Sequence, residues 1–525
     1  MIAGLDALEK KRLSLQVELD RCKDAAERNR LGQFATPPAL ALDIARYALR
    51  MWQERDEPVR FIDPAVGTGA FYSAAREVFP ESLVDQATGI EIDPVFADVA
   101  STLWEGTGLT VVTGDFTAQN VPPPDLRYNL MIANPPYVRH HCIATDDKQR
   151  LKAALRASLG LNVSGLAGLY CYFLLLSHDW LADNALGIWL IPSEFMDVNY
   201  GAAVKRYLSE RVCLLHVHRF CPSDVQFTDA IVSSAIVVFR KAPPPPGHSV
   251  RFSFGGSLLK PSLERRVSLS RLDVAAKWTQ YPDREVRGAS DRVPGGTLAD
   301  LFTVKRGIAT GANSFFILSA EDARQRGIPA ECLKPILPSP RYLSGDTVEA
   351  DSLGNPVTER RLFVIDCALP QDEIRLRYPE FWAYLECGRQ RGVDAGYLTS
   401  RRSPWYSQEK RDPAPFLCTY MGRGNGARDA IRFIGNKSVA TAPNVYLLLY
   451  PKEPLRSALG SDPELHSRVI GVLKALSLSD ILSEGRVYGG GLHKVEPREL
   501  GRVPAERLFD LAGKPEIPRQ LCMLG

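Results

Sequence analysis

The tetrapeptide Asn134-Pro135-Pro136-Tyr137 is the segment whose residue types point most directly to chemistry, and it follows the apolar run 129–133. Two prolines in a row fix the backbone and remove two N–H donors, so carbonyl oxygens are left as acceptors. The side-chain oxygen of Asn134 and the carbonyl of Pro135 can both accept from one planar NH2 group. These two acceptors would return the nitrogen lone pair from the ring to the nitrogen, which can then attack an electrophile held in line with it. Tyr137 offers a face on which a ring can stack.

Three acidic residues stand at the ends of three successive expected strands ahead of this tetrapeptide. Asp63 can hold an ammonium group, and Glu91 can accept hydrogen bonds from both hydroxyls of a ribose. Asp115 can accept from an adenine amino group, with Phe116 packing on the ring. The glycine-rich turn after Asp63 lets the backbone pass close to a ligand. Because it lacks the third glycine of a dinucleotide fingerprint and the lysine of a P-loop, this spacing predicts a nucleoside joined to an amino acid.

The elements that must position these side chains follow a regular pattern up to residue 240. Short apolar runs alternate with helical stretches, and the runs are 59–65, 88–92, 109–113, 130–133, 187–191, 214–218 and 230–239. Continuous apolar runs between helices are typical of buried parallel strands. We therefore expect a doubly wound α/β sheet of seven strands, with its ligand at the carboxyl ends of the strands. A charged amphipathic helix is expected over 5–30.

A run of four prolines with a glycine, residues 243–247, predicts a linker, because it can continue neither a helix nor a central strand. We expect a catalytic domain over 1–242 and a second domain over 248–525. The chain has a net charge of +3, yet residues 246–525 carry 40 Lys and Arg against 32 Asp and Glu. This imbalance favours an anionic partner for the second domain, such as nucleic acid.

The remaining composition restricts the class of protein. The ten cysteines are scattered and form no cluster at metal-ligand spacing, so we expect reduced thiols and no metal. The sequence has no apolar run of membrane-spanning length and no signal region. These features predict a soluble cytoplasmic protein that has no membrane partner.

In these motifs and their order, the first half resembles the N6-adenine DNA methyltransferases of the gamma group, as found in type II restriction–modification systems. Residues 32–38, GQFATPP, resemble the motif that precedes the glycine-rich turn in that group. The resemblance implies a class I, Rossmann-like methyltransferase fold with a separate C-terminal DNA-recognition domain, and S-adenosyl-L-methionine as cofactor. It assigns methyl transfer to residues 134–137. It assigns cofactor contacts to nine residues: Thr36, Asp63, Ala65, Gly67, Gly69, Glu91, Ile92, Asp115 and Phe116.

Further segments resemble the same group. Residues 187–192 are similar to a later strand-end motif, and Phe227 is similar to the aromatic that sandwiches a flipped base with Tyr137, a role for which Phe220 is a rival. Residues 304–316 resemble the start of a target-recognition region, and residues 490–497 resemble a segment near the C-terminus. The basic residues of these last two segments are candidate DNA contacts, namely Lys305, Arg306, His493 and Lys494.

The resemblance implies a monomer that methylates the N6 amino group of a flipped-out adenine in a short double-stranded DNA sequence. This modification would protect DNA from a cognate restriction endonuclease on a separate chain. The tetrapeptide alone predicts only that a planar NH2 is methylated, so the amino groups of RNA guanine, protein glutamine and cytosine N4 stay open. Residues 32–38 and the basic second half favour DNA. A chain with both methylase and nuclease, or a DNA-binding module without catalysis, are further alternatives.

Overall fold

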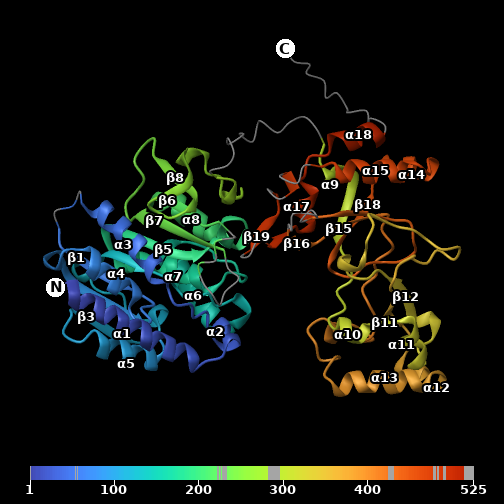
Figure 1. Cartoon of the computed structure of the whole chain (residues 1–525), viewed down its shortest axis with the longest axis horizontal. Coiled ribbons are helices and arrows are strands. Elements are labelled where there is room, and N and C mark those ends of the chain that lie inside the picture. Colours follow the sequence, from blue (N-terminus) through green and yellow to red (C-terminus); the bar gives the residue numbers. More distant parts are fainter. Residues whose placement is uncertain are drawn as a thin grey trace, which may run out of the picture. The chain divides into compact units, whose positions relative to one another are not determined.

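The computed structural model of the chain divides into two compact units (Figure 1). Each unit has its own hydrophobic cores. One unit comprises residues 1–291 and 488–490, and the other comprises residues 292–487 and 491–525. The structure describes most of the chain, in these ranges: 2–53, 55, 57–221, 224, 226, 233–281, 296–423, 431–476, 480–481, 484–488 and 492–512.

The first unit is built on a nine-stranded sheet with the strand order β3-β2-β1-β4-β5-β7-β6-β8-β9. Strands β3, β2, β1, β4 and β5 are parallel, whereas β7 runs antiparallel to both β5 and β6. The bounds are β1 Val59–Asp63, β2 Val84–Glu91, β3 Leu109–Thr113, β4 Tyr128–Ala133, β5 Leu181–Pro192, β6 Cys213–Arg219, β7 Ser234–Arg240, β8 Ser249–Gly256 and β9 Pro261–Ser268. The first seven are the strands expected from the sequence, whereas β8 and β9 were not expected, so the predicted count of seven strands was too low.

Helices cover both faces of this sheet, because successive side chains of a strand point to opposite faces. Phe61, Leu130 and Ile132 lie in one core with α3, α4 and α5. Their neighbours Ile62 and Met131 lie in a second core with α6, α7 and α8. The helices are α1 Ile2–Arg21, α2 Ala25–Leu31, α3 Pro38–Trp52, α4 Ala70–Val78, α5 Pro94–Leu103, α6 Thr145–Leu159, α7 Leu169–Leu176 and α8 Ala202–Glu210.

The helix expected over 5–30 is two helices, α1 and α2, with a break over 22–24. The carboxylate of Asp24 accepts a hydrogen bond of 2.7 Å from the backbone N–H of Glu27, and such a cap favours a new helix start over continuation. Helix α1 packs against α4 and α5 (Figure 1). Its Arg12 side chain is 1% exposed and donates to Glu9 and to the hydroxyl of Thr68 on the glycine-rich turn. The N-terminal helices are therefore part of the catalytic unit.

The predicted domain boundary at 243–247 differs from the division of the structure. The proline run connects β7 to β8, and β8 pairs in parallel with β6 in the same sheet. Val250 and Phe252 of β8 are buried in the core beneath that sheet. A run of prolines prevents regular hydrogen bonding within itself, but it can connect two strands of one domain as readily as two domains. The prediction was therefore wrong at this point, and the division lies near residue 291.

The second unit contains a five-stranded sheet of order β10-β18-β15-β17-β13 and two three-stranded sheets, β11-β14-β12 and β16-β20-β19. The strands are β10 Phe302–Arg306, β11 Ile317–Ser319, β12 Leu333–Ile336, β13 Thr347–Val348, β14 Leu362–Ile365, β15 Phe416–Thr419, β16 Met421–Arg423, β17 Phe433–Asn436, β18 Tyr446–Pro451, β19 Arg486–Tyr488 and β20 Leu492–Lys494. Its helices are α9 Leu298–Leu301, α10 Asn313–Phe316, α11 Ala320–Gln325, α12 Gln371–Arg377, α13 Pro379–Gln390, α14 Leu455–Ser461, α15 Leu465–Lys474, α17 Pro497–Gly501 and α18 Glu506–Ala512.

Two further observations concern the expectations from composition. Cys332, next to β12, and Cys367, just after β14, form a disulfide, so the expectation of reduced thiols throughout was wrong at this pair. The two antiparallel strands bring the cysteines together across 35 positions of sequence, a pairing that spacing alone does not show. Among the described residues, no helix is both long and apolar enough to cross a membrane.

Candidate active site

A pocket of 540 Å³ lies at the carboxyl ends of β1, β2, β3 and β4 in the first unit. Its volume is within the range of pockets that hold cofactors. The segments that follow these four strands supply much of its lining, and α1, α2, α6 and α7 supply most of the rest. The sequence predicted this position, because parallel strands end at one edge of a doubly wound sheet.

Asn134 follows β4 and lines this pocket. Its side-chain nitrogen donates two hydrogen bonds of 3.1 Å, one to the backbone carbonyl of Phe34 and one to the hydroxyl of Thr36. These two acceptors fix which way the amide is turned. The side-chain oxygen of Asn134 is buried and has no hydrogen-bond partner in the part of the chain that the structure describes. The amide is therefore held with its acceptor available. Thr36, a predicted cofactor contact, lies behind Asn134 as its hydrogen-bond partner.

The rest of the tetrapeptide is fixed by the chain that passes over it. The N–H of Tyr137 donates to the carbonyl of Gly32 over 3.1 Å, and the Tyr137 hydroxyl donates to the carbonyl of Leu190 on β5. Burial raises the pKa of Tyr137, so its hydroxyl keeps its proton. The Tyr137 side chain is only 7% exposed, and the ring of Phe34 lies 5.7 Å from it and lines the pocket. Sequence reasoning missed Phe34, although it is the aromatic residue of the predicted 32–38 motif.

Asp63 is the last residue of β1, directly before the glycine-rich turn, and is 1% exposed. One carboxylate oxygen accepts from the N–H of Ala65 over 3.0 Å. Burial raises the pKa of the Asp63 carboxyl to about 8, and the nearby charge of Glu91 adds to the effect. Gly67 has a φ of +53° and open space where a Cβ would lie, whereas a Cβ on Gly69 would lie 2.4 Å from the indole nitrogen of Trp104. A glycine is thus required at position 67 because the backbone there is in the left-handed region. A glycine is required at position 69 for the same reason and also because a side chain would clash with Trp104.

Glu91 ends β2 and lines the pocket beside this turn. Its two carboxylate oxygens accept from the backbone N–H groups of Gly67 and Asp93, over 3.0 and 2.9 Å. Burial raises the pKa of its carboxyl group. Ile92 follows with its side chain 65% exposed at the pocket wall, which is unusual for a large apolar residue and leaves a surface for a ring. Glu91 and Ile92 therefore both lie at the pocket wall.

The third predicted pair follows β3. Phe116 lines the pocket and packs against Phe173 and Trp180, with ring centroids 5.2 and 5.0 Å away. Asp115 also lines the pocket, and its carboxylate accepts from the N–H of Thr117 over 2.8 Å. The carboxylate thus caps a short 3-10 turn over Phe116–Ala118 while it faces the pocket.

Other pocket residues could not be inferred from the motifs. Gln16 and Asp20 come from α1, Arg30 from α2, and Asp147 and Arg150 from α6. The only available sequence signal was the polar face of each helix, and that pattern does not tell a pocket wall from a solvated surface.

The predicted base-stacking aromatic is not placed. Phe227 lies outside the residues that the structure describes. Its rival Phe220 is 4% exposed and packs edge-on against His218 in the core of the first unit, with centroids 4.7 Å apart.

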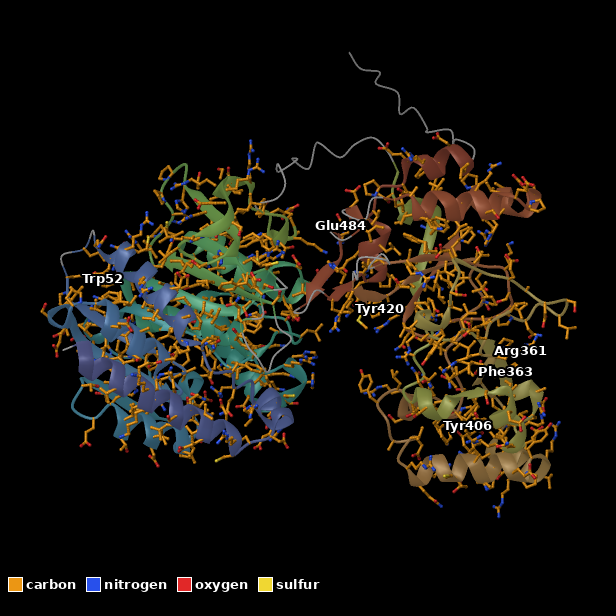
Figure 2. All side chains as sticks on the ribbon, in the orientation of Figure 1. Trp52, Arg361, Phe363, Tyr406, Tyr420 and Glu484 are labelled. Atoms are coloured by element: carbon orange, nitrogen blue, oxygen red, sulfur yellow. A yellow bond between two sulfur atoms is a disulfide. The ribbon has the colours of Figure 1, made fainter. Side chains whose placement is uncertain are left out.

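The predicted DNA contacts lie in the second unit, and two of them share one tyrosine. Arg306 of β10 and Lys494 of β20 both lie over the ring of Tyr420, at 4.2 and 5.1 Å from its centroid (Tyr420 is labelled in Figure 2). Lys305 lies over the ring of Tyr450 at 5.7 Å. Burial lowers the pKa of His493 of β20, so this side chain is neutral near pH 7. The strands thus bring Arg306 and Lys494, which come from distant segments of the sequence, into one basic cluster on the ring of Tyr420.

Comparisons with known proteins agree with this architecture. One family model, described as the type II methyltransferase M.Eco57I, C-terminal domain, matches residues 285–519, and the Eco57I restriction-modification methylase model matches residues 114–226. The type II methyltransferase M.XamI of Xanthomonas campestris pv. amaranthicola is 31% identical over 498 residues, which cover 92% of this chain and 86% of M.XamI. The chain belongs to the type II DNA methyltransferases of restriction–modification systems. M.AccI of Acinetobacter calcoaceticus is 25% identical over 518 residues, which cover 93% of this chain and 88% of M.AccI.

Two solved structures share the fold of this methyltransferase. The restriction-modification enzyme MmeI, in complex with DNA, has a TM-score of 0.54 at 14% identity and covers 85% of this chain and 66% of MmeI. The DrdV–DNA complex has a TM-score of 0.50 at 12% identity and covers 88% of this chain and 55% of DrdV. The chain therefore spans about two thirds of the length of MmeI and about half of the length of DrdV.

As a member of this family, the methyltransferase takes its methyl group from S-adenosyl-L-methionine, which supplies a methyl carbon made electrophilic by a sulfonium. The pocket residues fit this cofactor. Glu91 has the carboxylate for a ribose, the exposed Ile92 and the ring of Phe116 have apolar surface for an adenine, and Gly67 leaves the backbone open to close approach. The free oxygen of Asn134 lies at the β4 side of the same pocket.

Proposed function

We propose that this methyltransferase modifies the N6 amino group of an adenine that is flipped out of a short double-stranded DNA sequence. One observation carries the proposal: the buried side-chain oxygen of Asn134 has no partner among the described residues, while the nitrogen of the same amide has two. A buried acceptor without a partner costs about 1–3 kcal/mol. A donor from the substrate, such as an exocyclic NH2, would remove that penalty.

The residues around this oxygen define the chemical steps. Asn134 and the carbonyl of Pro135 would accept the two hydrogens of the amine, so that the lone pair is concentrated on the nitrogen and can attack the methyl carbon. The carbon–sulfur bond would break as the nitrogen–carbon bond forms, and the nitrogen would then lose one proton to solvent. Phe34 and Thr36 hold the amide of Asn134, and Gly32 holds the backbone of Tyr137, so both acceptors are fixed before the substrate arrives. Such fixed acceptors stabilise the transition state without reorganisation. Tyr137, with Phe34 beside it, and Phe227 are the proposed stacking partners of the base.

Adenine is favoured over cytosine because the first residue of the tetrapeptide is Asn134, where enzymes that methylate cytosine N4 more often carry serine. Membership of a DNA methyltransferase family leaves RNA guanine and protein glutamine without support.

For DNA binding we propose the basic cluster of the second unit. Arg306 and Lys305 are exposed on β10, and Lys494 lies beside Arg306 over Tyr420. Cations held against aromatic rings have defined positions, which suits contacts with phosphates. MmeI and DrdV were both solved with DNA, which supports this proposal by analogy of fold. We further propose that the enzyme acts as a monomer and that a cognate endonuclease is a separate chain.

An Asn134→Ala variant tests the role of the free oxygen. It removes one of the two acceptors, so the rate of methyl transfer to DNA should fall about 10²- to 10³-fold, as for other fixed groups that stabilise a transition state. The dissociation constant for S-adenosylmethionine should change little. Asn162, which is exposed before α7, provides the matched control, and Asn162→Ala should behave as wild type. Near-normal turnover in Asn134→Ala would refute the proposal.

A further inference from the structure

Arg150 on α6 makes a set of contacts inside the cofactor pocket that the motifs did not predict. Its guanidinium donates to the backbone carbonyl of Thr117 over 2.7 Å and to the Thr117 hydroxyl over 3.1 Å. It also donates to the carboxylates of Asp115 and Asp147, over 3.5 and 3.3 Å. All four residues line the pocket. Arg150 therefore links α6 to the turn that follows β3.

These contacts fix the Asp115 carboxylate. One of its oxygens, Oδ1, accepts from the Thr117 N–H over 2.8 Å, and the Thr117 hydroxyl lies 2.8 and 2.9 Å from the two oxygens. That hydroxyl has one hydrogen, so it donates to one carboxylate oxygen at a time and accepts from Arg150 through a lone pair. Arg150 thus holds the hydroxyl as well as the second oxygen, Oδ2.

Asp115 differs in this respect from Glu91, the other predicted cofactor carboxylate that lines the pocket. Both oxygens of Glu91 accept from backbone N–H groups, which no substitution of a side chain removes. Asp115 is held by one backbone N–H and by two side chains, and its own side chain is 35% exposed. Its orientation therefore depends on Thr117 and Arg150.

We propose that Arg150 is a positioning residue that makes the cofactor pocket selective for a 6-amino purine. It holds Asp115 so that Oδ2 accepts from the amino group of the cofactor adenine. This inference rests on the proposed contact between Asp115 and adenine. A 6-oxo purine presents an acceptor at the same place, where it would face a carboxylate without a hydrogen between them. Arg150 thus determines how strongly the pocket distinguishes adenosyl from inosyl ligands.

The test compares two ligands whose purines differ at C6, where an oxo group replaces the amino group, and at the neighbouring N1, which gains a hydrogen. Binding of S-adenosylhomocysteine and of S-inosylhomocysteine is measured by calorimetry, and the ratio of their dissociation constants is the readout. In Arg150→Ala this ratio should fall about fivefold to tenfold, the scale of one net hydrogen bond. Arg150→Lys should retain part of the ratio. It also serves as the second variant if Arg150→Ala does not fold.

The matched control is Arg156→Ala. Arg156 lies on the same helix, is exposed and does not line the pocket, so its removal changes the charge of α6 equally. It should keep the wild-type ratio. An Arg150→Ala variant that binds both ligands more weakly by the same factor would overturn the proposal, because a merely structural role predicts that result.

An Asp115→Asn variant separates this inference from the function on which it rests. If Asp115 accepts from the adenine amino group, this variant should lose the discrimination between the two ligands, and the proposal for Arg150 then depends on the Arg150→Ala result alone. If Asp115→Asn keeps the wild-type ratio, the contact between Asp115 and adenine is wrong, and the role of Arg150 falls with it.

Discussion

At the scale of single residues, Asp63 combines a buried position with a proposed charge partner. Its carboxyl is 1% exposed, and burial raises its pKa from 3.8 to about 8, although the N–H of Ala65 opposes this shift. Below pH 8 the free protein therefore holds a proton on Asp63. If the ionised carboxylate pairs with the ammonium of the cofactor, as the sequence predicts, binding must release this proton.

The expected result is a cofactor affinity that depends on pH. As pH rises from 6.5 toward 8, less free energy is used to remove the proton, so the affinity for S-adenosylmethionine should increase, by up to about tenfold per unit. Above pH 8 the increase should stop, because the α-amino group of the cofactor itself loses its proton near that pH. Calorimetry in buffers of different ionisation enthalpy measures the proton release directly. Asp63→Asn has no proton to release and should bind weakly with a flat profile. A flat profile in the wild type would show that Asp63 is not the ammonium partner.

A substitution at Gly32 tests whether the catalytic tetrapeptide, residues 134–137, depends on the segment 32–38 that packs against it. Gly32 has a φ of +68°, and a Cβ there would lie 2.4 Å from the backbone nitrogen of Tyr137. We expect Gly32→Ala to displace the catalytic tetrapeptide and to lower the rate of methyl transfer at least tenfold, since misplacement by about 1 Å can cost 10²-fold.

Gly160 is the matched control, because it has the same φ of +68° but its Cβ would meet only the tip of Arg211 at 3.9 Å. Both alanine variants should lose about 1 kcal/mol of unfolding free energy from backbone strain. Only Gly32→Ala should lose activity, and equal activity in the two variants would contradict the account.

At the scale of elements, the seven expected strands are all present. The apolar runs of the central strands reflect burial on both faces, whereas β3 lies at the edge of the sheet and is largely exposed. The positions of Asp63, Glu91 and Asp115 could be predicted from those strands, because parallel strands end at one edge of the sheet. Arg150 and Asp20 did not follow, because their contacts depend on how α6 and α1 pack, which no local pattern encodes. The prediction of a domain boundary at the proline run was wrong because the pairing of β8 with β6 is a long-range contact, which a local pattern does not encode.

Helix α1 gives a prediction at this scale. The buried guanidinium of Arg12 holds Glu9 on its own helix and Thr68 on the glycine-rich turn. Arg12→Ala leaves Glu9 without this partner and should lower the free energy of unfolding by about 2–3 kcal/mol. Cofactor binding should weaken as well, because Thr68 directly follows Gly67, which lines the pocket. Arg21→Ala, an exposed site on α1, is the control. Equal stability of both variants in chemical denaturation would show that α1 docks without Arg12.

At the scale of the whole molecule, the chain has one unit that carries the cofactor pocket and one that carries the basic cluster. Each phosphate contact adds a slope of about −0.9 to the dependence of log affinity on log salt. A double variant, Arg306→Ala with Lys494→Ala, should therefore reduce the slope for DNA binding by about 2 if both contact phosphates. Arg375→Ala, an exposed cation on α12, should leave the slope unchanged. An unchanged slope in the double variant would place the DNA contacts elsewhere.

The second unit was the part least accessible from sequence. Its strands are short, and residues that share Tyr420 come from β10 and β20, which are far apart in the chain. Motif resemblance identified Arg306 and Lys494, but their common partner became visible only in the structure.

The identity of the methylated base tests the central claim most directly. Plasmid DNA from a host without methyltransferases is incubated with the enzyme and with S-adenosylmethionine that carries an isotopically labelled methyl group. The DNA is then digested to nucleosides and analysed by mass spectrometry. The account predicts that the label is found in N6-methyldeoxyadenosine. Label in N4-methyldeoxycytidine would contradict it.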